Sequence, residues 1–335
     1  MAETLIIAEA GVNHNGSLKN AYKLARIAKQ SGADFVKFQF FVSTSLASKK
    51  SIKAKYQIKN LRNKNISQLK MLNKLQLDID DLIKVEKYCN KIRINFLLSF
   101  FDHKSIRHVN KFNLKYIKIP SGEITNYPLL RNIAKTKKKI ILSTGMANLK
   151  EISDALKVLF LYNTPRKRIT ILHCTTDYPA LRKDVNLNSM LTIKEKFKCD
   201  VGYSDHTINF DASVYATVLG ARIIEKHFTI NKSMKGPDHK ASLNPKELKK
   251  FVKKIRNVKE ILGSKTKKIR VSEIKNIKHV RKSVYASREI KKDEILDDDN
   301  IMPKRPFNKN NPMNWNKIIG KKSKKNFKKD EEIKF

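Results

Sequence analysis

The chain lacks any long hydrophobic run. Its sequence holds no apolar stretch near the ~20 residues that a membrane-spanning helix needs. The N-terminal segment MAETLIIAEAGVNHNG also lacks the basic residues that precede the apolar part of a secretory signal. We therefore expect a soluble, cytoplasmic protein that does not enter a membrane.

Cysteine is scarce. The three cysteines, Cys89, Cys174 and Cys199, lie far apart along the chain, and no C-x-x-C pair suggests a zinc or redox site. We expect reduced thiols, which agrees with a cytoplasmic location.

Acidic residues are few beside the basic ones. The chain has 31 Asp and Glu against 72 Lys and Arg, a formal net charge of +41. This excess raises nucleic-acid binding as an alternative function, because Lys and Arg bind phosphate backbones. The lysines are spread over nearly the whole chain, which favours a solvated basic surface instead. We expect no nucleic-acid partner, although the basic tail GKKSKKNFKKDEEIKF keeps that alternative open.

Short runs of branched and aromatic residues alternate with amphipathic segments. We predict strands at 4–10, 34–41, 94–100, 115–122, 139–145, 168–176, 200–206 and 221–228. Between the first two, the segment SLKNAYKLARIAKQSGA has one apolar face and a glycine after it, which predicts a helix. This alternation predicts an α/β fold, a closed parallel (β/α)8 or TIM barrel, with an open doubly wound sheet as the alternative.

The pattern changes after Gly263. We predict a barrel domain at 1–263, a linker at 264–280 and a small β-rich domain at 281–335. The last domain is too small to have much core of its own, so we expect it to dock on another surface. Within the barrel, 43–64 is longer than an ordinary loop, and is either a functional lid or a solvated, lysine-rich insertion.

Two lysines stand on strands with their side chains facing inward. Lys37 and Gln39, in DFVKFQFF, point to the same face because side chains alternate along a strand, and Lys118 alternates with isoleucines in the same way. A buried lysine is costly unless it meets an anion. The pattern predicts a bound phosphate or carboxylate, or an internal salt bridge to Glu9 or Glu123.

Polar residues gather where the predicted strands end, which is where the active groups of such barrels lie. These residues are Glu9, Lys37, Gln39, Ser99, Lys118, Ser121, Glu123, Ser143, Thr176, Tyr178, Ser204, His206, Glu225 and His227. The set is too polar for a packed interior, and it predicts a functional site at this end of the barrel.

His206 and His227 end the seventh and eighth strands, which would be neighbours roughly 5 Å apart. Two imidazoles this close could hold one divalent ion. Positions left open for water and substrate suit Mn²⁺ or Mg²⁺ better than a structural zinc. Two core histidines satisfied by hydrogen bonds are the alternative.

Several segments together carry a family resemblance. They are IIAEAGVNHNGS, DFVKFQ, YIKIPSGE, ILSTGM, LHCTTDYP, GYSDHT, IEKHFT, KGPDH and KRP. In this order they resemble the bacterial sialic acid synthase family over nearly the whole chain. Members of that family condense phosphoenolpyruvate with an N-acetylated amino sugar. The resemblance implies a TIM barrel followed by an antifreeze-like (SAF) domain, in a domain-swapped homodimer whose small domains each cover the other subunit's barrel.

The resemblance also assigns roles by position. The phosphoenolpyruvate-binding residues would be Lys37, Ser99, Lys118, Ser121, Ser143, Thr176 and Ser204, with Ser99 at a position where the family usually has threonine. The sugar-binding residues would be Gln39, Tyr178, Asp238 and, from the small domain of the other subunit, Arg305. The metal, Mn²⁺ or Mg²⁺, would bind to His206 and His227.

The catalytic residues would be Glu123 and Glu9. Glu123 is the candidate for proton transfer, because a carboxylate held between lysines stays ionised and can accept a proton. Glu9 would act beside the sugar. A barrel that kept its fold but lost activity is disfavoured, because the matched positions keep chemically competent side chains.

The implied function is the metal-dependent synthesis of N-acetylneuraminate from phosphoenolpyruvate and N-acetylmannosamine. The alternative acceptor is a 2,4-diacetamido sugar, which would give N,N'-diacetyllegionaminate by the same chemistry. Pseudaminate is disfavoured, because EAGVNHNG resembles the first two groups more closely.

Overall fold

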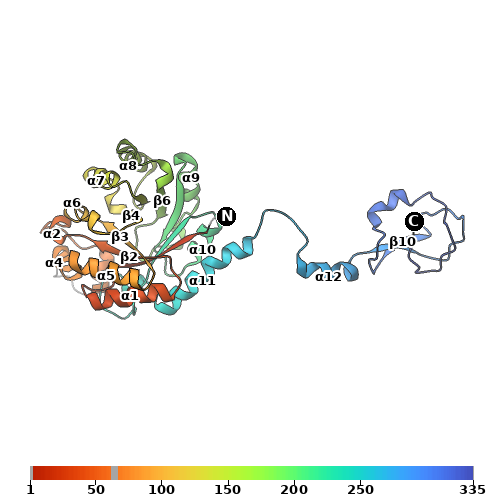
Figure 1. The fold of residues 1–335 in the computed structure, drawn as a ribbon, viewed down its shortest axis with the longest axis horizontal. Helices are drawn as coiled ribbons and strands as arrows, with labels where there is room; N and C mark the ends of the chain where they lie inside the picture. The colour runs from red at the N-terminus through yellow and green to blue at the C-terminus, as the bar shows by residue number, and fades with distance from the viewer. Residues whose placement is uncertain (1–2, 62–66, 335) are drawn as a thin grey trace. The chain divides into compact units, whose positions relative to one another are not determined.

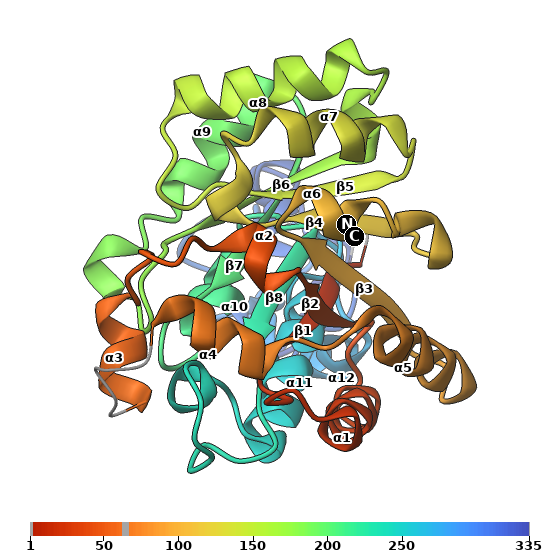
Figure 2. The same ribbon diagram turned by 90° about the vertical axis from the view of Figure 1, so that its left-hand side faces the viewer.

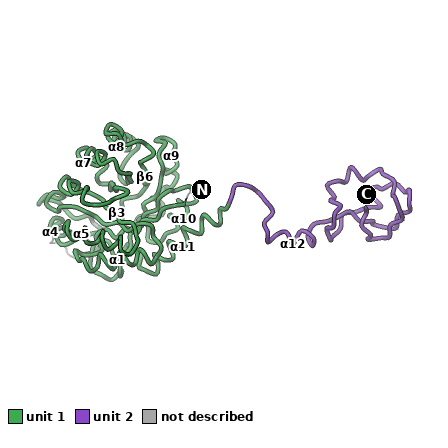
Figure 3. Tube along the Cα trace, in the orientation of Figure 1, with its two compact units in different colours: residues 1–263 green, residues 264–335 purple. Residues whose placement is uncertain are grey.

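The computed structural model describes residues 3–61 and 67–334. By its internal contacts the chain divides into two compact units, residues 1–263 and residues 264–335 (Figure 3). The first unit contains the barrel, and the second contains a small sheet (Figure 1).

Eight parallel strands close into a barrel in sequence order, and β8 pairs with β1. They are β1 (Leu5–Gly11), β2 (Phe35–Phe40), β3 (Asn95–Phe100), β4 (Tyr116–Ile119), β5 (Lys139–Ser143), β6 (Ile169–Cys174), β7 (Asp200–Asp205) and β8 (Ile223–His227). Each lies within a predicted strand or extends it by a single residue. The (β/α)8 prediction is confirmed, and the open sheet is excluded.

Helices surround the barrel (Figure 2). They are α1 (Leu18–Gln30), α5 (Ile79–Lys91), α6 (His103–Ile106), α7 (Tyr127–Lys135), α8 (Leu149–Leu161), α9 (Asn188–Phe197), α10 (Asp211–Val218) and α11 (Pro245–Leu262). In α1 the predicted apolar face is buried, and the Ser17 side chain caps the N-terminus by accepting from the backbone N–H of Asn20. Among the described residues, no helix is long and apolar enough to cross a membrane.

Three further helices form what we call the inserted layer: α2 (Ser43–Leu46), α3 (Lys55–Leu61) and α4 (Gln68–Leu75). The sequence at 43–64 shows no periodicity, yet the structure forms α2 and α3 there; residues 62–64 of that predicted loop lie outside the described residues. Helices α2 and α4 lie at one end of the barrel, on the left in Figure 1 and toward the viewer in Figure 2. Asn60 ties the layer to the loop after β8, donating to the Pro237 carbonyl at 2.6 Å.

The inside of the barrel changes from apolar to polar along its strands. One buried layer, the apolar floor, consists of Ile7, Phe35, Leu97, Ile141, Leu172 and Ile223. Two residues further along the same strands stand Glu9, Lys37, Ser99, Ser143, Cys174 and Glu225. Because strand side chains alternate with a period of two, the same inward face carries both layers. The floor therefore closes the barrel beneath the polar layer.

The second unit begins with α12 (Val271–Val280), within the predicted linker, and contains the antiparallel pair β9 (Ser283–Ala286) and β10 (Ile301–Lys304). Its buried apolar residues are Val284, Ala286, Ile290, Leu296, Ile301, Ile318, Phe327 and Ile333. The sequence predicted little core in this small domain. The structure corrects this, because several short β segments fold around one shared cluster.

A buried ion pair joins β7 and β8 on their outer faces. The Lys226 ammonium lies 3.1 Å from Asp205 Oδ1 and donates to the Thr207 carbonyl at 2.6 Å. The other carboxylate oxygen of Asp205 accepts from the Ser213 hydroxyl of α10 at 2.6 Å. Because Asp205 precedes His206 and Lys226 precedes His227, this network holds the two histidine-bearing strand ends together.

We predict that Lys226→Met lowers the free energy of unfolding by about 3–5 kcal/mol, because it leaves the Asp205 carboxylate buried without its cation. The matched control is Lys157→Met, which removes an exposed partner of Asp154 and should leave stability nearly unchanged. Urea unfolding of both variants measures the difference. Equally small changes in the two would show that the buried pair does not stabilise the fold.

Candidate active site

A cavity of about 150 Å³ opens where the strands end. Its lining contains every predicted site residue except Glu123, Asp238 and Arg305. These lining residues are Glu9, Lys37, Gln39, Ser99, Lys118, Ser121, Ser143, Thr176, Tyr178, Ser204, His206 and His227. Side chains as far apart in sequence as Glu9 and His227 thus converge at the predicted end of the barrel.

Glu225 joins the two buried lysines of this cavity. Its carboxylate lies 2.7 Å from the Lys37 ammonium and 3.2 Å from the Lys118 ammonium. It also accepts from the Ser204 hydroxyl at 2.9 Å, while Lys37 lies a further 3.2 Å from Glu9. The predicted salt bridge of Lys37 to Glu9 is present, but the carboxylate that both lysines share is Glu225.

Glu123 does not lie between the lysines, which corrects the reason for its assignment. It stands in a short 3₁₀ turn after β4, where its carboxylate accepts from the Asn126 amide at 2.7 Å. Burial raises its pKa. The signal that could have identified Glu225 instead is its parity: it precedes His227 by two residues, so both side chains face into the barrel.

Burial and charge shift the four ionisable groups in different directions. Burial alone would lower the pKa of Lys37, but Glu225 and Glu9 outweigh it and raise that pKa. Burial lowers the pKa of Lys118 to about 8 and raises that of Glu9 to about 7. Burial by itself would raise the pKa of Glu225, but the positive charges of Lys118 and Lys37 outweigh burial and lower that pKa. Near neutral pH the cluster therefore carries a net positive charge.

Hydroxyl groups without partners surround this charge. Ser143 Oγ and Thr176 Oγ1 are buried and have no hydrogen-bond partner in the described part of the chain. The backbone at Gly145 lies close to Thr176, because a Cβ at this position would lie 2.0 Å from Thr176 Oγ1. The backbone N–H of Gly145 donates to Ser121 Oγ at 3.0 Å. Buried polar groups are normally hydrogen-bonded, so these groups are arranged for a ligand with acceptor oxygens. Together with the two lysines they suit an anion, and we call them the candidate anion site.

The two predicted metal ligands lie side by side, with ring centroids 5.8 Å apart. His206 Nδ1 lies 2.6 Å from the Thr175 carbonyl, which can only accept, so Nδ1 carries the proton and Nε2, 3.5 Å from Ser204 Oγ, carries the lone pair. Burial lowers the pKa of His206 to about 4 and also lowers that of His227, which keeps both rings neutral.

His227 Nδ1 is buried without a hydrogen-bond partner among the described residues. Neutral imidazoles, one of which has a buried nitrogen without a described partner, fit a divalent metal better than two core histidines satisfied by hydrogen bonds. No group of three His, Cys, Asp or Glu suited to a metal occurs in the described ranges. These two rings would therefore leave coordination positions for water or substrate.

A second cavity, of about 300 Å³, adjoins the first. Both cavities are lined by Gln39, Phe101, Tyr178 and His227. Asp238 lines only the second one, and burial raises its pKa to about 6. A carboxylate in such a place can accept from a ligand hydroxyl or amide. The polar groups predicted for a sugar therefore face a space beside the candidate anion site.

Tyr178 forms the boundary between the two cavities. Its ring lies 4.2 Å from the His206 ring and 5.0 Å from the ring of Tyr56 in the inserted layer. Burial raises its pKa well above the usual range, so the phenol stays neutral and can donate. Arg305, the remaining predicted sugar contact, is exposed within the second unit, where its side chain donates to the Val280 carbonyl at 2.8 Å.

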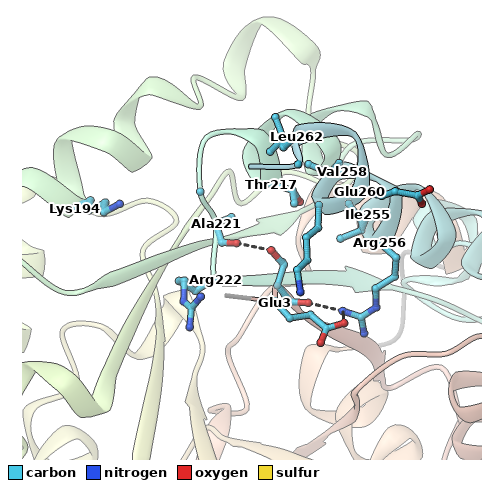
Figure 4. Close-up of a pocket in the computed structure, with 14 residues that line it drawn as sticks. Glu3, Lys194, Thr217, Ala221, Arg222, Ile255, Arg256, Val258, Glu260 and Leu262 are labelled. Carbon is cyan, nitrogen blue, oxygen red and sulfur yellow. Dashed lines mark hydrogen bonds and ion pairs between the residues drawn. The ribbon is translucent and has the colours of Figure 1, made fainter. Parts of the chain in front are cut away.

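Another cavity, of about 640 Å³, lies where the strands begin (Figure 4). It is lined by residues such as Thr4, Arg222 and Leu262, and Thr4 donates to the Ala221 carbonyl there. Its Arg256 is already paired with Glu3 and with Asp34. Groups at this end of such barrels serve stability, so the catalytic chemistry belongs to the other end.

The comparisons with known proteins agree with this geometry. The NeuB family profile matches residues 24–267, and the SAF domain profile matches residues 281–335. The chain is 52% identical to the N,N'-diacetyllegionaminic acid synthase of Campylobacter jejuni, with 99% of each chain covered. It is 41% identical to the N,N'-diacetyllegionaminic acid synthase of Legionella pneumophila, over 94% of this chain and 89% of that relative.

A solved structure is similar as well. It is the crystal structure of N-acetylneuraminic acid synthetase from Leptospira borgpetersenii in complex with citrate. It superimposes with a TM-score of 0.72 at 29% identity, over 82% of this chain and 90% of that chain.

We predict that the first cavity binds sulfate and that the affinity falls in two steps between about pH 6 and pH 9, each by up to about tenfold. The lower step follows ionisation of Glu9, with a pKa of about 7, which adds a negative charge; the upper follows deprotonation of Lys118, with a pKa of about 8, which removes a positive one. Sulfate keeps its charge throughout. Calorimetric titration across this range measures both steps.

Two variants separate the steps. Glu9→Gln should abolish the lower one and Lys118→Met the upper one. The control Lys150→Met, whose side chain is 89% exposed on α8, should keep both. An upper step that persists in Lys118→Met would show that another group titrates.

Proposed function

Since this chain belongs to the NeuB family and carries an SAF domain, we propose that it condenses phosphoenolpyruvate with a 2,4-diacetamido sugar to give N,N'-diacetyllegionaminate and phosphate. The observation that carries the proposal is the 52% identity, over nearly the full length of both chains, with a relative named as the synthase of that product. This supports the alternative acceptor over N-acetylmannosamine, which the sequence resemblance by itself favours.

The first cavity suits phosphoenolpyruvate, which carries a phosphate and a carboxylate. Lys37 and Lys118 supply positive charge that Glu225 only partly offsets. The hydroxyls of Ser143 and Thr176 have no other described partner and are free to donate to oxygens of the ligand. Ser99, Ser121 and Ser204 lie in the same lining.

The adjoining cavity suits the acceptor sugar. Gln39, Tyr178 and Asp238 present an amide, a neutral phenol and a carboxylate to it. C3 of phosphoenolpyruvate would bond to the aldehyde carbon of the open-chain sugar, whose oxygen takes up a proton. Water would then add at C2, and phosphate would leave as the C2–O bond breaks. The shared lining of the two cavities supports a reaction in which these two carbons meet at the junction.

Glu9 is the proton-transfer group that the geometry supports best. A pKa of about 7 leaves Glu9 partly protonated at neutral pH. Its carboxylic acid form can therefore donate a proton to the aldehyde oxygen and become a carboxylate. It also accepts from the Gln39 amide at 3.4 Å, next to the acceptor cavity. Glu123 is not among the described residues that line either cavity, so we assign it a supporting role in the turn after β4.

His206 and His227 would hold a divalent metal, Mn²⁺ or Mg²⁺, which when bound would polarise the aldehyde as a Lewis acid. Contacts and burial within the chain favour metal binding by these two rings. The Thr175 carbonyl orients His206, and the Tyr178 ring packs against it. Desolvation keeps the imidazoles unprotonated over the whole neutral range.

We further propose a domain-swapped homodimer, in which Arg305 of one subunit completes the acceptor site of the other. The family resemblance and the exposed position of Arg305 in its own unit support this. A cytoplasmic location is also part of the proposal, and the three free cysteines agree with it.

We predict phosphate release only when phosphoenolpyruvate, a divalent metal and an N-acetylated amino sugar are all present. The kcat/KM should be at least about tenfold higher for the 2,4-diacetamido sugar than for N-acetylmannosamine. A coupled phosphate assay on both sugars measures this ratio. Absence of release with any N-acetylated sugar, together with salt-sensitive DNA retention that persists in Lys37→Ala, would favour the nucleic-acid alternative instead.

We predict that a chelator abolishes turnover and that Mn²⁺ or Mg²⁺ restores it. His227→Ala should bind Mn²⁺ at least about tenfold more weakly, because one of two imidazole ligands is lost. His103→Ala is the matched control, since His103 lies on α6 outside both cavities' described linings. Spectroscopic titration of Mn²⁺ follows binding without turnover. Unchanged Mn²⁺ affinity in His227→Ala would place the metal elsewhere.

A further inference from the structure

The acceptor cavity has an apolar side as well as a polar one. The polar groups come partly from the barrel and its loops, namely Gln39, Tyr178, His227 and Asp238, and partly from the inserted layer, namely Tyr56, Gln57 and Gln68. The apolar groups come from the ends of β1 to β3 and from the inserted layer. They are Val12, Phe41, Leu46, Ala47, Met71, Leu72, Leu75 and Phe101. The inserted layer thus supplies both apolar and polar side chains to the cavity.

The apolar side has a packed back and an open front. Val12, Phe41, Met71 and Leu75 are buried in one cluster, which holds the wall rigid. Leu46, Leu72 and Phe101 pack on that cluster but are only partly buried, and they line the cavity. This apolar side therefore does more than form the core of the inserted layer. It also leaves apolar surface exposed to the cavity, which a ligand could cover.

Helix α4 contributes an ordered stripe to this wall. Gln68, Met71, Leu72 and Leu75 all line the cavity, and their spacing of i, i+3, i+4 and i+7 places them on one helix face. The stripe begins with an amide in the first turn and continues with apolar side chains. Ser67 caps the helix by accepting from the Lys70 amide, so the first turn, with Gln68, is held in place.

A hydroxyl group placed against the apolar side chains of this side of the cavity, such as Leu72, would lose water and find no hydrogen-bond partner in them, which costs about 1–3 kcal/mol. A methyl group placed there would instead gain about 0.8 kcal/mol from burial. An acetamido group combines a methyl with an amide that needs hydrogen bonds. The stripe offers both complements in order, first the Gln68 amide and then the apolar surface of Leu72.

We propose that the α4 stripe is the specificity-determining subsite for the second acetamido group of the acceptor sugar. The Gln68 side chain pairs with the amide of that group, and Leu72, backed by Met71 and Leu75, covers its methyl. N-Acetylmannosamine carries a hydroxyl where the diacetamido sugar carries this group, so the stripe disfavours it. The inference rests on the proposed function and names the residues that choose between its two acceptors.

The test compares kcat/KM for the two sugars at saturating phosphoenolpyruvate in the full-length enzyme with metal. Leu72→Gln should lower the value for the diacetamido sugar by about 10- to 100-fold and that for N-acetylmannosamine by less than about threefold. Gln68→Ala should lower the first value by about tenfold by removing the amide partner. The KM for phosphoenolpyruvate should not change, because neither side chain lines the anion cavity.

The control is Leu161→Gln, a matched substitution at a side chain that is 68% exposed at the end of α8. It should leave both sugars unaffected. Thermal unfolding checks that each variant is folded. If Leu72→Gln does not fold, Gln68→Ala, which removes no core side chain, tests the subsite by itself. An unchanged ratio between the sugars in these variants would overturn the subsite but leave the proposed function intact. Failure of the wild type on both sugars would overturn the function itself.

Discussion

One carboxylate shared by two buried lysines is the interaction on which the site depends. Without Glu225, Lys37 and Lys118 would stand as two like charges in a desolvated barrel, and neither could remain ionised without cost. With Glu225 and a fully ionised Glu9 the lysines would be neutralised, and little attraction for an anion would remain. The intermediate pKa of Glu9, about 7, avoids both extremes. At neutral pH most of the charge in the cluster is balanced, and a small net positive charge remains.

The rest of the barrel keeps this cluster desolvated and in register. The apolar floor closes the interior below it, and the buried pair of Lys226 and Asp205 locks the strand ends that carry the histidines. The inserted layer covers the space beside it and brings Tyr56 against Tyr178. The site thus consists of a polar layer at the ends of the strands above an apolar layer on the same inward-facing side of the barrel strands.

Much of the fold could be predicted from the sequence, and so could the convergence of most candidate site residues on one cavity. Strand and helix periodicities differ, so their alternation predicted the barrel, and strand parity predicted that Lys37, Gln39 and Lys118 face inward. The partner of the lysines could not be predicted, because Glu225 lies 188 and 107 positions from them along the chain. Sequence proximity to Lys118 suggested Glu123, but a 3₁₀ turn directs its carboxylate to Asn126 instead.

The sequence by itself determined the period of each segment, the polar residues at the strand ends and the family to which they belong. Tertiary structure alone decided which charges pair, which nitrogen of His206 carries the proton, and that an aperiodic stretch forms helices and lines the second cavity. The physical reason is that local periodicity is set by neighbours along the chain. Pairing and desolvation are set by barrel closure, which brings β8 beside β1 and places Glu225 between two lysines from other strands.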